Sequence, residues 1–277
     1  MAPPPPRPIL ATLFDMDGLL IDSEDLYTLI TNLILAEHSR PPLPWSIKAQ
    51  MQGRPGPAAG AIFHTWAQLP ITREDFMRRQ TELQKEHFPA TQPLPGVVEL
   101  LEGLKNRGVE MALATSSHKG NFKIKTHHLE HIFNVFGPEH KVLGDDVRIP
   151  KGRGKPAPDI YLLALQTINT RRRSEGKEEI LPEQCLVFED SVPGVESGRR
   201  AGMQVVWCPH PGLRQEFKGR EEEVLAGLTG EFIEGEAVRE KAGEVGDGWG
   251  VLLETLEKFP YERFGFGGES GKTRERL

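Results

Sequence analysis

Ile9-Leu10-Ala11-Thr12-Leu13-Phe14-Asp15-Met16-Asp17-Gly18 is an apolar run that ends in two carboxylates. The run predicts a buried strand over about residues 8–14. Side chains at positions i and i+2 of a strand point the same way, so Asp15 and Asp17 can converge on one centre. Because an unpaired buried carboxylate is costly, a partner such as a cation is expected beside them. The alternative for the pair alone is a turn in which Asp-Gly serves loop geometry.

Composition is that of an ordinary globular chain. The 277 residues suffice for one large domain or two modest ones, and 38% are hydrophobic and 27% charged. The net charge of −6 argues against a nucleic-acid partner bound through a broad basic face. No apolar stretch approaches the ~20 residues that span a bilayer, and no signal-like apolar segment follows Met1. We therefore expect a cytoplasmic protein without a membrane partner, either a monomer or a weak homo-oligomer.

Helical periodicity follows the acidic motif. A helix is predicted over residues 23–37, with Ser23 as its N-cap. Two further helices are predicted around 57–68 and 72–88, separated by Pro/Gly breaks. Residues 26–93 are thus expected to form a small helical module, inserted into a larger domain made of residues 8–25 and 94–277.

From residue 94 onward helices and strands alternate. The strands are predicted at 109–114, 141–144, 185–188 and 203–208, and the helices at 97–108, 120–132, 159–168 and 193–201. This alternation requires a parallel sheet with crossover helices, so the fold class is α/β with a doubly wound sheet.

Three other stretches of the larger domain have separate predictions. The charged stretch 170–182 is expected to be a surface insertion. One more helix is predicted from Trp249, Leu252, Leu253 and Leu256, and the last ten residues are expected to fray. Cys185 and Cys208 are expected to be core residues rather than a disulfide.

Polar residues follow three strand ends and one loop of this predicted sheet. Ligands of doubly wound sheets bind outside the carboxyl ends of the strands. Each residue has a simpler interpretation, as a helix cap or a solvated loop side chain, but their joint position at one rim favours a site. The residues are Asp15, Asp17, Thr115, Ser116, Lys155, Glu189 and Asp190.

The set suits phosphoryl transfer. Asp15 would attack phosphorus and become an aspartyl phosphate. Asp17 would protonate the leaving oxygen and then activate water. Thr115 and the backbone amide of Ser116 would hold phosphate oxygens, and Lys155 would offset negative charge.

A metal ion is part of this prediction. Mg²⁺ suits oxygen ligands from a few carboxylates and water. Asp15 and Asp190 are the expected side-chain ligands, and Glu189 would bind either directly or through water.

Four motifs resemble those of the haloacid dehalogenase superfamily, in that family's order and over about residues 10–210. They are Phe14-Asp15-Met16-Asp17-Gly18, Ala114-Thr115-Ser116-Ser117, Gly154-Lys155-Pro156-Ala157-Pro158-Asp159 and Val187-Phe188-Glu189-Asp190-Ser191. The resemblance implies a Rossmann-like core with an α-helical cap inserted after the first motif. It also implies that Asp17 gives its backbone carbonyl to Mg²⁺. Further stretches, among them Leu143-Gly144-Asp145-Asp146 and Ala201-Gly202-Met203-Gln204-Val205-Val206, resemble the pseudouridine-5′-phosphatase branch, and this resemblance implies a nucleotide-like or sugar monophosphate as substrate.

Two alternative functions stay open at this point. A phosphosugar mutase of the same superfamily would return the phosphoryl group to the substrate instead of to water. A non-catalytic binding protein would retain the fold, although the intact motif residues argue against it.

Outside the four motifs, weaker signals remain. Gly53 and Arg54 lie in a Gly/Pro-rich break, where Arg54 either binds a phosphate or polar sugar or is an exposed loop residue. His127 and His131 lie four apart on a predicted helix and are expected on its surface rather than at a metal. A local basic patch near Thr115 is expected to be a solvated face, with attraction of an anionic substrate as the alternative. The patch consists of His118, Lys119, Lys123 and Lys125.

Overall fold

The computed structural model describes residues 8–54, 56–229 and 242–266. Its centre is a parallel six-stranded sheet with the strand order β3-β2-β1-β4-β5-β6, which confirms the α/β fold class. In this order the chain reverses its direction of winding between β1 and β4, the position where doubly wound sheets bind ligands. The strands are β1 (Ala11–Phe14), β2 (Glu110–Ala114), β3 (Lys141–Val142), β4 (Cys185–Glu189), β5 (Gln204–Trp207) and β6 (Gly250–Leu252).

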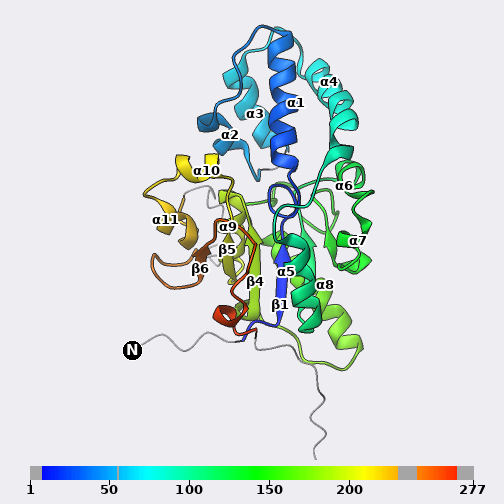
Figure 1. Cartoon of the computed structure of the whole chain (residues 1–277), viewed down its shortest axis with the longest axis vertical. Coiled ribbons are helices and arrows are strands. Elements are labelled where there is room, and N and C mark those ends of the chain that lie inside the picture. Colours follow the sequence, from blue (N-terminus) through cyan, green and yellow to red (C-terminus); the bar gives the residue numbers. More distant parts are fainter. Residues whose placement is uncertain (1–7, 55, 230–241, 267–277) are drawn as a thin grey trace, which may run out of the picture.

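Helices cover both faces of the sheet, because each strand alternates its side chains between two hydrophobic cores (Figure 1). Phe14 and Phe188 face one core and stack with their ring centroids 4.6 Å apart. That core is covered by α5 (Val97–Asn106), α6 (Lys119–Thr126) and α7 (Glu130–Phe133). The opposite core is covered by α8 (Asp159–Ser174), α9 (Val192–Arg200), α10 (Pro211–Glu216) and α11 (Glu221–Ala226).

Four helices stand above the carboxyl edge of the sheet and form the inserted cap (Figure 1). They are α1 (Ser23–Glu37), α2 (Trp45–Met51), α3 (Gly56–Ala67) and α4 (Arg73–His87), followed by a 3-10 turn at Phe88–Ala90. They enclose a third hydrophobic cluster, which contains Ile30, Ile34, Phe63, Phe76, Leu83 and Phe88.

The two chain segments that lead into and out of the cap run side by side. The amide of Asp22 donates to the carbonyl of Gln92 at 3.0 Å, and the amide of Leu94 donates to that of Leu20 at 3.1 Å. Ile21 and Pro93 form an antiparallel bridge between these bonds. The cap therefore leaves and rejoins the core at one place.

The cap also contacts the core through α2. The Trp45 ring stacks on the His210 ring at 4.6 Å between centroids. Lys48 of the same helix is buried and donates from Nζ to the Glu24 carbonyl at 2.9 Å and the Thr28 hydroxyl at 2.6 Å. The Trp45 contact holds α2 against the core, and the Lys48 contacts hold α2 against α1 within the cap.

Several predicted elements differ from the structure. The helix predicted near the C-terminus is wrong, because residues 250–252 form β6 beside β5, where they pair with backbone groups of the sheet edge. The predicted helix 120–132 is interrupted between α6 and α7, so His127 and His131 do not share a helix. Residues 170–174 belong to α8, whose Arg172 pairs with Glu110 of β2 at 3.2 Å. Helix α2 was not predicted, and the last ten residues lie outside the described residues.

Candidate active site

The first and fourth motifs meet where the sheet changes its direction of winding. β1 and β4 are neighbours with Phe14 opposite Phe188, and the Asp15 amide donates to the Phe188 carbonyl at 3.0 Å. Asp15 and Glu189 therefore emerge side by side from adjacent strands. Thr115 follows the next strand, β2, and is fully buried.

Lys155 joins the two strand ends. Its Nζ lies 2.5 Å from Asp15 Oδ1 and 2.6 Å from Glu189 Oε1, and its side chain is buried. The Tyr161 hydroxyl of α8 donates to the same Glu189 oxygen at 2.6 Å. The loop lysine of the third motif is thus an internal cation that pairs with Asp15, which explains why a buried charge is tolerated there.

Glu189 is fully supplied with hydrogen-bond donors. Its Oε2 accepts from the amides of Asp190 and Ser191, each at 3.1 Å, and from the Ser191 hydroxyl at 3.0 Å. Because Oε1 is held by Lys155 and Tyr161, neither oxygen is left without a protein partner. The carboxylate is fixed in place and orients Lys155 toward Asp15.

Negative charge nevertheless exceeds positive charge among the described residues at this point. Burial raises the pKa of Asp15 to about 7, with Glu189 and Asp17 adding to the effect and Lys155 opposing it. Burial, followed by Glu189 and Asp15, raises the pKa of Asp190 well above its ordinary value. Asp15, Glu189 and Asp190 each offer a ligand atom, and these atoms lie within 4.8 Å of one another. Such a donor set fits a hard divalent cation.

Gly18 lets the first motif turn against Asp190. Its φ is +77°, which side-chain-bearing residues rarely adopt, and a Cβ there would lie 2.2 Å from Asp190 Oδ2. The close approach of these two segments therefore requires glycine.

Asp17 is separated from the Lys155 group and held by donors of its own. Ser23 donates to Oδ1 at 2.5 Å, Ser117 donates to Oδ2 at 2.6 Å, and Lys125 Nζ binds Oδ1. Burial would raise the pKa of Asp17, but Lys125 and the two hydroxyls hold it below its ordinary value. The prediction that Lys125 belongs to a solvated face is wrong, because its side chain is fully buried.

The cap reaches the site through the loop after α2. Gln52 donates from Nε2 to Asp190 Oδ2 at 2.5 Å, and its buried Oε1 has no hydrogen-bond partner in the described part of the chain. Gly53 packs on Ser191, where a Cβ would lie 2.2 Å from the hydroxyl oxygen, and its carbonyl accepts from Ser116 Oγ at 3.4 Å. Sequence reasoning did not identify Gln52 as a site residue. Its position next to Gly53, in the Gly/Pro-rich break between the cap helices, was the signal that could have identified it.

Arg54 follows Gly53 in the same loop. Its Nε donates to the Gln50 carbonyl at 2.6 Å, an exposed bond within the cap. Gln52, two residues earlier, contacts Asp190 of the core.

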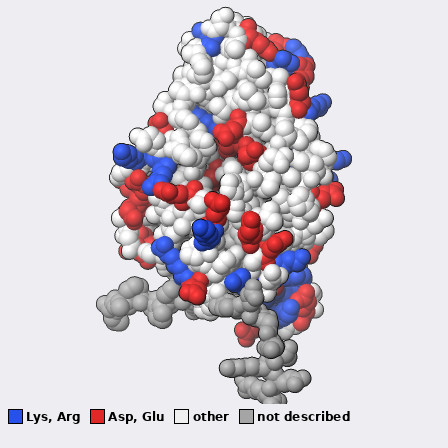
Figure 2. Space-filling view, viewed as in Figure 1, with Lys and Arg blue, Asp and Glu red and all other residues white. Residues whose placement is uncertain are grey.

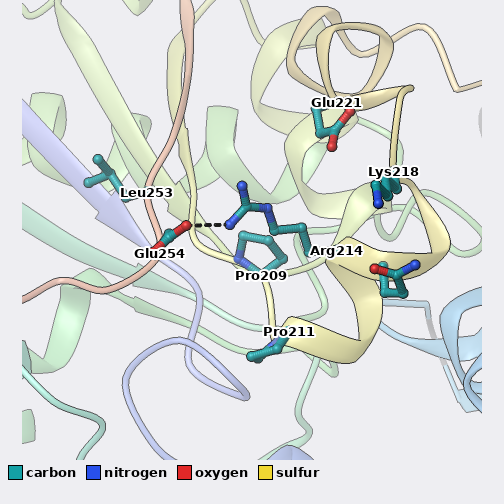
Figure 3. A pocket seen from close by; sticks show the side chains of 8 residues that line it. Pro209, Pro211, Arg214, Lys218, Glu221, Leu253 and Glu254 are labelled. Carbon is teal, nitrogen blue, oxygen red and sulfur yellow. Dashed lines mark hydrogen bonds and ion pairs between the residues drawn. The ribbon is translucent and has the colours of Figure 1, made fainter.

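A further cavity of about 590 Å³ lies away from this group, beside α10 and α11 (Figure 3). Arg214 pairs with Glu254 at 2.6 Å in this cavity. Figure 3 shows this pair together with Lys218 and Glu221, which also line the cavity. Its charges compensate one another and it contains no group of the four motifs, so we do not assign the chemistry to it. Figure 2 shows acidic and basic side chains interspersed, without a continuous basic face in this view.

A parallel sheet of this order, with aspartates and a lysine at its switch point and a helical insertion after the first strand, suits an enzyme of phosphoryl transfer. A family model described as "haloacid dehalogenase-like hydrolase" matches residues 12–208. The chain belongs to this family and is a phosphoric monoester hydrolase. No helix among the described residues is long and apolar enough to span a membrane.

Named relatives are phosphatases with different substrates. The chain is 40% identical over 260 residues, 94% of its length and 98% of the relative's, to a protein of Saccharomyces cerevisiae named "Probable pseudouridine-5'-phosphatase". It is 34% identical to an Arabidopsis thaliana (DL)-glycerol-3-phosphatase, over 79% of this chain and 70% of that one. A crystal structure from Thermotoga maritima titled "putative beta-phosphoglucomutase" matches with a TM-score of 0.58 and 28% identity, covering 90% and 96% of the two chains.

Proposed function

We propose that this protein is a Mg²⁺-dependent phosphatase that hydrolyses pseudouridine 5′-phosphate through an aspartyl-phosphate intermediate. The observation that carries the proposal is the buried Asp15 at the switch point, paired with Lys155 and adjacent to Asp190. The name of the Saccharomyces cerevisiae relative supports the substrate, because that similarity covers 94% of this chain and therefore includes the cap.

Asp15 is the proposed nucleophile. Its carboxylate oxygen attacks phosphorus, the bond to the leaving oxygen breaks, and the phosphoryl group is left on Asp15. Lys155, 2.5 Å from Oδ1, keeps the carboxylate oriented and offsets charge on the transferred group. Thr115 and the Ser116 amide, at the end of β2, hold phosphate oxygens.

Asp17 is the proposed acid–base group. It protonates the leaving oxygen in the first half-reaction and takes a proton from the attacking water in the second. Water then releases inorganic phosphate and restores the Asp15 carboxylate.

The carboxylates of Asp15 and Asp190 and the backbone carbonyl of Asp17 would hold Mg²⁺. Glu189 is the fourth member of the set and would act through water, since both of its oxygens already accept protein hydrogen bonds. When bound, the ion offsets the charge of the phosphate and the carboxylates.

The test is hydrolysis of a panel of phosphate esters by the purified full chain, followed by release of inorganic phosphate. The panel contains pseudouridine 5′-phosphate, uridine 5′-phosphate, glycerol 3-phosphate and β-glucose 1-phosphate, each with Mg²⁺ and with EDTA. We expect the highest kcat/KM for pseudouridine 5′-phosphate and no phosphate release in EDTA. Preference for glycerol 3-phosphate would contradict the substrate but not the chemistry.

A mutase is the second candidate, because the Thermotoga maritima neighbour carries that name at 28% identity. It would convert β-glucose 1-phosphate to glucose 6-phosphate without net phosphate release. Product analysis of the same panel separates the two functions.

A further inference from the structure

Lys125, which lies outside the four motifs, is at the centre of a buried polar cluster around Asp17. Its Nζ binds Asp17 Oδ1 and lies 2.6 Å from the Ser117 hydroxyl, which itself donates to Asp17 Oδ2 at 2.6 Å. The Ser23 hydroxyl approaches Oδ1 at 2.5 Å. Both oxygens of Asp17 are therefore engaged, and the three polar groups together fix the rotation of its carboxylate.

Apart from Asp17 and Ser117, the neighbours of the Lys125 ammonium group in the described part of the chain are aromatic side chains. The Tyr27 hydroxyl lies 3.4 Å from Nζ, and the rings of Tyr27 and Phe88 have centroids at 5.1 and 5.3 Å. The side chain is fully buried, so its charge costs desolvation free energy that Asp17 offsets. Its backbone is also fixed, because the Thr91 hydroxyl donates to the Lys125 carbonyl at 2.6 Å.

Three segments distant in sequence meet at this carboxylate. Ser23 begins α1, Ser117 follows β2 and Lys125 belongs to α6. Ser23 is also the first residue of α1, the helix that follows the first motif. The position of α1 against the core and the orientation of the Asp17 carboxylate therefore depend on the same hydrogen bonds.

We propose that Lys125 is a positioning residue for the acid–base reaction, which holds the Asp17 carboxylate in the orientation needed to reach the leaving oxygen. This inference rests on the proposed function, in which Asp17 exchanges a proton with the leaving group. Proton transfer requires hydrogen-bond reach, and a catalytic group misplaced by about 1 Å can cost 10²-fold in rate. A carboxylate without this lysine could rotate about its side-chain torsions between the two remaining hydroxyls.

The experiment measures kcat/KM of the full chain, with Mg²⁺, for phenyl, 4-chlorophenyl and 4-nitrophenyl phosphate. These esters differ in how much protonation their leaving groups need, and kcat/KM reports the steps up to departure of the leaving group. Asp17→Asn must first lose more kcat/KM on phenyl phosphate than on 4-nitrophenyl phosphate. If it does not, the acid–base role of Asp17 fails, and the inference about Lys125 fails with it.

Lys125→Met is the informative variant, because it keeps an unbranched buried chain and removes the ammonium. We expect kcat/KM for phenyl phosphate to fall by up to about 10²-fold, with a clearly smaller loss for 4-nitrophenyl phosphate. The double variant with Asp17→Asn is expected to be no slower than Asp17→Asn alone, since both remove the same function.

Lys48→Met is the matched control. Lys48 is also a buried, ion-paired lysine, but its partners are Glu24 and Thr28 rather than Asp17. We expect Lys48→Met to lower kcat/KM by the same factor for all three esters, because it acts through stability alone. Its effect is expected to add to that of Asp17→Asn.

An equal loss on all three esters for Lys125→Met, or a loss that adds to that of Asp17→Asn, would overturn the inference and leave Lys125 a structural residue. If Lys125→Met does not fold, Ser117→Ala is measured in its place, because it removes the hydroxyl that joins Lys125 to Asp17 Oδ2. The same dependence on leaving group is expected for it, and equal losses would overturn the inference.

Discussion

At the scale of single residues, the two aspartates of the first motif are each held by a different buried lysine. Lys155 binds Asp15 and Glu189, whereas Lys125 binds Asp17. Two carboxylates separated by one residue are thus placed in different surroundings. The pKa of Asp15 is raised by burial, whereas that of Asp17 is lowered by Lys125 despite burial.

Asp15→Asn is expected to abolish phosphate release, because an amide oxygen is too weak a nucleophile to attack phosphorus. The substitution keeps the side-chain shape and can still accept the hydrogen bond from Lys155. Phosphate release is measured, with circular dichroism and thermal unfolding as checks that the variant folds. Turnover close to that of the native enzyme would contradict the covalent mechanism.

Asp190→Asn tests the metal assignment. The change removes one carboxylate from the acidic group and leaves an amide that Gln52 can still bind. We expect the Mg²⁺ concentration for half-maximal activity to rise by at least about tenfold, and EDTA to abolish the activity of the native enzyme. An unchanged Mg²⁺ requirement would exclude Asp190 as a ligand.

At the scale of elements, the strands and the motifs at their ends follow from the sequence, whereas the contacts between distant helices do not. Asp15 and Glu189 each end a short apolar run, and the parallel sheet brings such ends together. Lys125 is one of three lysines in α6, which is flanked by His118 and His127, and no local pattern distinguishes the one lysine that is buried. Its burial depends on Asp17, 108 residues away. Residues 250–252 were predicted as helix because their apolar spacing is short enough to fit either period.

The cap loop allows a direct comparison of two residues. Gln52→Ala removes the contact with Asp190, and Arg54→Ala removes a guanidinium that is bound to the cap itself. We expect each change to raise KM for the preferred metabolite more than for 4-nitrophenyl phosphate, because the aryl ester leaves the cap contacts unused. Equal effects of Arg54→Ala on both substrates, or none, would mean that Arg54 is an ordinary surface residue.

Gly250→Ala tests the strand β6. A Cβ at this position would lie 2.6 Å from the carbonyl oxygen of Leu225, which is backbone and cannot move aside. We expect the free energy of unfolding in urea to fall by about 1–3 kcal/mol. Gly120→Ala in α6 is the matched control, since its Cβ would meet only the His118 ring at 3.4 Å, and it is expected to be neutral or slightly stabilising.

At the scale of the whole molecule, the structure is closed over its site. Asp15, Lys155 and Asp190 are 7%, 2% and 2% exposed, Gln52 of the cap contacts Asp190, and Gly53 packs on Ser191. Substrate entry therefore requires the cap to move away from the core. Such closure excludes bulk water while the phosphoryl group is transferred. The leaving oxygen then takes its proton from Asp17, the proposed acid–base group.

Trp45 reports this movement. Its ring stacks on that of His210 in the core, with the centroids 4.6 Å apart. This contact exists only while α2 lies against the core. Because opening removes the His210 ring from the Trp45 ring, beryllium fluoride with Mg²⁺, which mimics the phosphorylated aspartate, is expected to change tryptophan emission by closing the cap. Trp45→Phe should remove the change and Trp66→Phe should retain it. A change that survives Trp45→Phe would show that it originates elsewhere.

The adjacent entry and exit segments of the cap make it a replaceable unit. Because Ile21 already pairs with Pro93, residues 24–90 could be exchanged for a tight turn without separating any two strands of the sheet, with Ser23 kept to bind Asp17 and Thr91 kept to bind the Lys125 carbonyl. Loop-closure entropy grows only slowly with length, so an insertion at this point costs the core little, whatever its size. Substrate choice can accordingly change by exchange of one segment, while the residues that break the phosphate bond stay where they are.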